Sequence, residues 1–133
     1  MARVRETNGE IMYTVIRFVA ETIYLPMLMK IGTAMNAIRP GVYTGLRKAG
    51  DGFSCEICTG IGWAKHHREI LSFIADFSEL INQSIRDGAS VTVDIAVEPE
   101  DQKSHRGVYA IHHDHKLLVA LASCGAELEI SIY

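Results

Sequence analysis

Two cysteines separated by two residues form the most familiar chemical motif of the chain. The segment Cys55-Glu-Ile-Cys58 has the spacing of a redox dithiol or of half a zinc site. A redox pair usually opens a helix, whose N-terminal dipole lowers the pKa of the first thiol, but this pair falls in a segment with strand-like alternation. Side chains three apart on a regular strand point to opposite faces. We therefore expect two small apolar residues here and no metal or redox site.

Histidines form a second candidate group for metal binding, in the segment His112-His-Asp-His115. A strand would place His113 and His115 on one face, as a pair of zinc ligands requires, but a helix is expected to begin within this interval. We therefore expect a solvated turn in which Asp114 caps the helix. Neither motif predicts a metal site or a cofactor, although a ligand role for each of them stays open.

A third group of polar side chains, Lys65-His-His-Arg68, stands near the expected start of a long helix. Positive charges at this end oppose the helix macrodipole, and a bound anion would relieve that conflict. A solvated helix end costs only roughly a few tenths of a kcal/mol per charge. We therefore expect solvated side chains here in preference to an anion site.

Acidic side chains gather in the second half of the chain. Residues 1–75 carry nine Lys or Arg against six Asp or Glu, whereas residues 76–133 carry four against ten. Grouped carboxylates attract a basic partner and raise its rate of association. We predict a partner-binding acidic edge formed by Asp94, Glu98, Glu100 and Asp101. The last three lie in an expected polar loop, and Asp94 lies on the strand before it; the alternative is an ordinary solvated surface.

The hydrophobic pattern predicts the elements that must position these groups. Alternating apolar residues and β-branched side chains predict strands at residues 12–20, 53–59, 90–97, 107–111 and 127–132. Helical spacing predicts helices at about residues 22–37, 65–86 and 115–124. Glycine and proline residues between positions 39 and 52 predict turns, with a short edge strand as an option between them.

The helix at residues 65–86 has the strongest helical periodicity of the chain. Its apolar stripe should lie on the sheet and comprises Ile70, Phe73, Ile74, Phe77, Leu80, Ile81 and Ile85. In the last helix we expect three leucines to face inward, Leu117, Leu118 and Leu121. Trp63 should be buried where the second strand meets the long helix, because a lone tryptophan usually fills the core.

The order of these elements indicates an α+β fold. We expect a two-layer sandwich in which the helices pack on one face of a mainly antiparallel sheet. A length of 133 residues favours a single domain over residues 1–133. Within it, residues 1–11 are polar and are expected to form a flexible or loosely attached N-terminal segment.

The composition argues against several classes of protein. Apolar residues make up 48% of the chain and charged residues 22%, which is typical of globular domains. The net charge of −3 argues against a nucleic-acid partner, whose phosphates require a basic excess. No apolar stretch approaches the ~20 residues that span a bilayer, and the polar N-terminus does not resemble a signal peptide. With its odd number of cysteines, the chain is expected to be cytoplasmic and to bind no membrane.

The C-terminal two-thirds of the chain also carries a recognisable set of motifs. They are the segment from Phe53 to Gly60, the long helix, the strand from Val91 to Val97, and the closing Cys124-Gly-Ala-Glu-Leu-Glu-Ile-Ser-Ile-Tyr133. Over residues 53–133 these motifs resemble the bacterial family called domain of unknown function 4279. The resemblance implies a small cytoplasmic α+β domain without a known catalytic set, so it supplies no active-site residues.

The resemblance indicates a function only by association. Small stand-alone bacterial proteins of this sort are often immunity proteins, encoded beside polymorphic or contact-dependent toxins. We therefore expect a protein that is not an enzyme and that binds and neutralises a cognate basic toxin, with a nuclease as one candidate. The alternatives are a small-ligand-binding or regulatory sensor domain without catalysis and, third, an enzyme of unknown class. The sequence leaves the identity of the toxin and the oligomeric state open.

Overall fold

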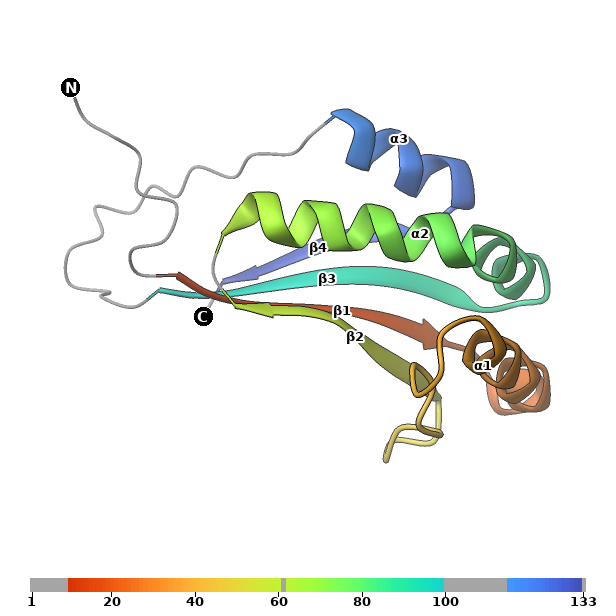
Figure 1. Ribbon diagram of the computed structural model, residues 1–133. Helices are drawn as coiled ribbons and strands as arrows, with labels where there is room; N and C mark the ends of the chain where they lie inside the picture. Colours follow the sequence, from red (N-terminus) through yellow and green to blue (C-terminus); the bar gives the residue numbers. More distant parts are fainter. Residues whose placement is uncertain (1–9, 61, 100–114, 133) are drawn as a thin grey trace, which may run out of the picture.

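Helices pack on one face of a four-stranded sheet, and no helix of the described part of the chain covers the other face (Figure 1). The computed structural model describes residues 10–60, 62–99 and 115–132. The strands are β1 (Glu10–Val19), β2 (Gly52–Gly60), β3 (Ser90–Pro99) and β4 (Glu127–Ile132). The helices are the 3-10 turn η1 (Thr22–Tyr24), α1 (Leu25–Ile38), α2 (Trp63–Arg86) and α3 (His115–Cys124). The predicted α+β sandwich is confirmed.

The strand order in the sheet is β2-β1-β3-β4, with β1 and β3 in the middle. β1 pairs antiparallel with both β2 and β3, so the sheet is mainly antiparallel as predicted. β4 pairs parallel with β3. The long connection between them, which contains α3, permits this pairing, because parallel neighbours cannot be joined by a tight turn.

Strand alternation assigns each side chain of the sheet to one of two faces. On β1, Met12, Ile16 and Phe18 are buried under the helices. Their partners on β3 are Val97, Val93 and Val91, so these apolar residues of the two strands meet on the covered face. We call the opposite side of the sheet the open face. It is formed by the odd-numbered residues of β1, the even-numbered residues of β3 and their strand partners on β2 and β4.

The long helix α2 provides most of the apolar surface that covers the sheet. Its fully or nearly fully buried apolar side chains are Ile70, Phe73, Ile74, Phe77 and Ile81, while Leu80 and Ile85 are partly buried against the same core. Trp63, at the start of the helix, is buried as predicted. In α3 the prediction was correct for Leu117 and Leu121 but wrong for Leu118, which is 46% exposed. One helix residue turns the side chain by about 100°, so the narrow contact of α3 with α2 excludes Leu118.

The first helix, α1, contains a proline and a glycine, and each has a defined place in it. Pro26 occupies the first turn of α1, where a backbone N–H would have no partner within the helix, so proline costs no hydrogen bond there. Gly32 lies in the middle of α1 and is buried against the ring of Tyr43. A Cβ atom at position 32 would overlap that ring, so glycine allows the close approach.

The short edge strand considered between residues 39 and 52 does not form. The side chain of Asn36 binds both backbone groups of Tyr43: its amide donates to the Tyr43 carbonyl at 2.9 Å, and its oxygen accepts from the Tyr43 N–H at 2.8 Å. These bonds replace those that a neighbouring strand would supply, and the segment follows turns instead. The strand expected at residues 107–111 and the cap expected at Asp114 lie outside the described residues. In the part of the chain that is described, no helix is long and apolar enough to cross a membrane.

Because Gly32 is in close contact with Tyr43, the effect of Gly32→Ala on stability should change sign when Tyr43 is removed. Gly32→Ala should destabilise the protein by roughly 1–3 kcal/mol, because overpacking outweighs the gain in helix propensity of about 1 kcal/mol. In the Tyr43→Ala background the same substitution should stabilise, since the obstructing ring is absent. Urea unfolding of the four proteins measures both effects, and a stabilising Gly32→Ala in the native background would contradict the packing described here.

Candidate functional site

The open face of the sheet is acidic along β2, β3 and β4, while β1 contributes Tyr13, Val15 and Val19 beside Arg17. Its carboxylates come from the three strands β2, β3 and β4 and are Glu56, Asp94, Glu98, Glu127 and Glu129. Arg17 on β1 is the one Lys or Arg among all residues of the four strands. No helix in the described ranges lies over this face: in Figure 1, α2 and α3 are drawn above the strands, and α1 lies beside the ends of β1 and β2. The strands therefore present an excess of negative charge to solvent.

Arg17 links three strands across the middle of the open face. Its Nη1 donates to Oδ2 of Asp94 at 2.8 Å, and its Nη2 donates to Oε2 of Glu129. The hydroxyl of Ser131 donates to the other Asp94 oxygen at 3.0 Å. The hydrogen bond with Asp94, followed by the contribution of Glu129, raises the pKa of Arg17 above its ordinary value despite partial burial. One cation thus holds two carboxylates, and the network keeps a net negative charge.

The four residues of the predicted acidic edge have different positions in the structure. Asp94 is only 8% exposed and is held by Arg17, so its carboxylate positions the strands and is not free to contact a partner. Glu98 is exposed on the same face, but it belongs to β3, whereas the prediction placed it in a loop. Glu100 and Asp101 lie outside the described residues.

Three exposed carboxylates of the open face were missed by the sequence reasoning: Glu56, Glu127 and Glu129. Each alternates with apolar neighbours on its strand, which is the signal that could have found them. The parallel pairing of β4 with β3 brings Glu127 and Glu129 beside Thr92 and Asp94. That pairing joins positions more than 30 residues apart, and alternation within one strand contains no information about it.

The cysteine pair lies on the covered face, and the prediction of opposite faces was wrong. The register between β1 and β2 shifts after Thr14, which is opposite Cys58, so that Val15 is opposite Glu56 and Ile57 is the extra residue of a β-bulge. The bulge turns both Cys55 and Cys58 inward, and both are buried. Burial raises the pKa of Cys55 to about 12 and also raises that of Cys58. Both thiols are therefore protonated at neutral pH, which disfavours nucleophilic or metal-binding chemistry.

Basic side chains in the first turn of α2 form hydrogen bonds with the end of β2. His66 is fully buried; its Nε2 lies 3.0 Å from the Gly60 carbonyl, and its Nδ1 lies 2.6 Å from the Thr14 hydroxyl. Because a carbonyl only accepts, Nε2 carries a hydrogen and donates it to Gly60. Burial favours the neutral ring by lowering the pKa of His66, and in that ring Nδ1 accepts from the Thr14 hydroxyl. Lys65 donates to the Thr59 carbonyl at 3.0 Å. These side chains bind backbone carbonyls, so they fasten the helix to the sheet.

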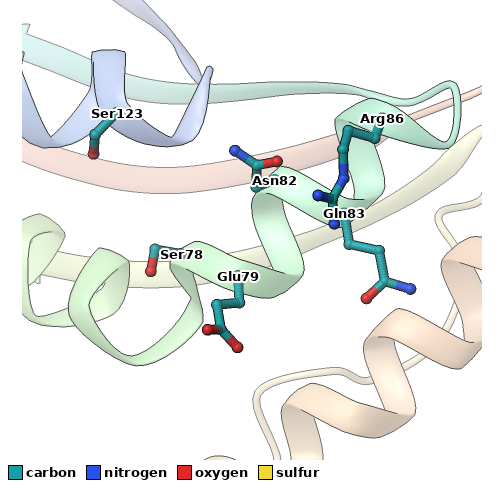
Figure 2. A pocket seen from close by; sticks show the side chains of 6 residues that line it. All are labelled: Ser78, Glu79, Asn82, Gln83, Arg86 and Ser123. Atoms are coloured by element: carbon teal, nitrogen blue, oxygen red, sulfur yellow. The ribbon is translucent and has the colours of Figure 1, made fainter.

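The described residues contain no group of three or more His, Cys, Asp or Glu arranged to hold a metal ion. A hollow of about 500 Å³ lies between α2 and α3 and is shown in Figure 2. It is lined by Ser78, Glu79, Asn82, Gln83, Arg86 and Ser123. None of these side chains is buried, whereas a ligand pocket normally encloses its ligand between apolar walls. The hollow is therefore part of the solvated surface of α2 and lacks the enclosure of a ligand pocket.

Comparison with known proteins gives no match for this chain among family models, curated proteins or solved structures. The resemblance of residues 53–133 to domain of unknown function 4279 stays a prediction. Function must therefore be argued from the geometry of this chain, and the open face is its most distinctive surface.

The buried His66 predicts how stability depends on pH. Burial lowers the pKa of His66 from its ordinary value of 6.5, because the charged ring would lose its hydration. The unfolded chain therefore binds a proton before the folded protein does, so this contribution to stability is complete above about pH 6.5 and falls as the pH decreases below it. Urea unfolding at pH values of about 7.5 and 5 should show this loss, and His66→Gln should reduce it. An equal loss in the variant would contradict the assignment to His66.

Proposed function

We propose that this protein is a non-catalytic immunity protein, which neutralises a cognate bacterial toxin by covering a basic surface of it with the open face of the sheet. One observation carries the proposal: the open face has five carboxylates and one cation among its described residues, and no described helix covers it. Its four exposed carboxylates are Glu56, Glu98, Glu127 and Glu129.

The arrangement of side chains on the open face supports protein binding. Tyr13 on the central strand β1 is 46% exposed, and its partner on β3 is the small Ala96. Tyrosine is enriched at the centre of binding interfaces, where it is surrounded by polar contacts. The exposed carboxylates lie on strands to either side of β1, so the ring of Tyr13 is flanked by acidic side chains. Lysine and arginine side chains of a partner would complement this pattern.

Such binding would inhibit a toxin without chemistry by the inhibitor. A toxin that acts on nucleic acid needs basic residues to hold phosphate groups, and a protein that occupies those residues blocks access of the substrate. The proposal therefore requires neither a catalytic group nor a cofactor in this chain. It places the protein in the cytoplasm, where such a toxin would act. The resemblance to domain of unknown function 4279 supports it by association alone.

A ligand-binding or regulatory sensor domain is the second candidate function. The hollow in Figure 2 is the observation that favours it, since Arg86 and Glu79 place both charge signs beside amide and hydroxyl groups. The open geometry of the hollow makes it the weaker candidate. It predicts that substitutions in the hollow, and none on the open face, change the activity of the protein.

Charge reversal on the open face tests the first candidate. The double variant Glu56→Lys with Glu98→Lys changes two exposed carboxylates on different strands, and Glu79→Lys in the hollow is the control with an exposed carboxylate on α2. The protein to be tested as the partner is the purified product of the neighbouring reading frame. The double variant should bind it at least about tenfold more weakly, mostly through slower association, and the difference should shrink in high salt.

The control should bind like the native protein, and unfolding curves should show that all variants remain folded. Cells that produce the partner should be protected by the native protein and by Glu79→Lys, and poorly protected by the double variant. Loss of binding in Glu79→Lys with normal binding in the double variant would contradict the open-face proposal and favour the sensor.

A further inference from the structure

The two edges of the sheet differ in how they are protected against pairing with another strand. β2 carries the β-bulge at Ile57, which interrupts regular pairing, and the start of β2 is bonded to the preceding loop through Arg47 N–H and the Gly52 carbonyl at 2.7 Å. β4 has neither device. Its register with β3 is regular over the whole strand, and it contains no proline, lysine or arginine. No described strand pairs with the outer edge of β4.

The side chains of β4 divide into an acidic row and an apolar row. Glu127 and Glu129 are exposed on the open face. Leu128 and Ile130 point to the helix side, where they are only partly buried against the core, and Ile132 beyond them is 48% exposed. An added strand would place its side chains beside these two rows in alternation.

We propose that the outer edge of β4 takes an extended segment of the partner as a fifth strand, with basic and apolar side chains in alternation. This inference rests on the proposed function and names the mode of binding. Basic residues of the segment would lie beside Glu127 and Glu129, and apolar residues would extend the partly buried row on the helix side. Backbone hydrogen bonds give affinity in this mode, and the alternating side chains give specificity.

Charge argues against a second copy of the chain as the occupant. Antiparallel pairing of two β4 edges would bring Glu127 and Glu129 of both copies together on one face, and like charges on neighbouring strands destabilise a pair. Arg17 compensates only part of this charge, because it also binds Asp94. The same carboxylates attract a basic strand, so the edge selects its partner by charge.

Synthetic peptides test the edge independently of any toxin. The first peptide alternates lysine and valine, the second contains the same residues as a block of lysines followed by a block of valines, and the third is the alternating peptide N-methylated at every second residue. The alternating peptide should bind at least about tenfold more tightly than the other two, because only it can form a regular strand with this pattern. Its binding should protect backbone amides of residues 127–132 from hydrogen exchange.

A matched pair of variants locates the site. Glu127→Lys on β4 should weaken binding of the alternating peptide by about tenfold or more, whereas Glu56→Lys at the opposite edge should have a much smaller effect. Equal binding of the three peptides, or equal effects of the two variants, would overturn the edge proposal and leave electrostatic binding to the open face intact. Complete protection of the β4 amides in the free protein would overturn it as well, since the edge would already be occupied. Failure of the partner protein to bind at all would instead remove the proposed function.

Discussion

The apolar stripe of α2 contacts only one face of the sheet, and the positions of the other side chains depend on this contact. Residues such as Phe73 and Phe77 are buried because β1 and β3 present alternating apolar side chains beneath them. The same alternation places the intervening residues on the opposite side, and on β3 and β4 these residues are mostly polar. Arg17 then bonds Asp94 and Glu129 across three strands of that side. A buried core on one face thus produces a charged surface on the other.

The sequence was sufficient to predict the elements with strong periodicity. The alternation from Val91 to Val97 and the stripe of α2 gave their faces correctly, because burial of apolar area is the largest local signal. The bulge at Ile57 was not predictable in this way, since it arises from the pairing of β2 with β1. It places Cys55 and Cys58 on one face, where regular alternation would have separated them.

In the candidate site too, features that depend on strand pairing were not predictable from the sequence. Glu98 was identified from the charge of its segment, and the structure places it on the open face. The role of Asp94 was not predictable, because its partner Arg17 is 77 residues away in the chain. Glu127 and Glu129 join the site only through the parallel pairing of β4. Local patterns therefore predict which face a residue occupies, whereas the composition of a surface depends on strand order.

Amide chemical-shift mapping tests the central claim most directly, namely that the open face is where a basic partner binds. Isotope-labelled protein would be titrated with a lysine-only peptide, which probes charge without requiring a particular strand pattern. We expect shifts at residues of the open face, including Glu56, Glu98 and Glu127, and none at the hollow between α2 and α3. Shifts confined to the hollow, at Ser78, Asn82 and Ser123, would contradict it.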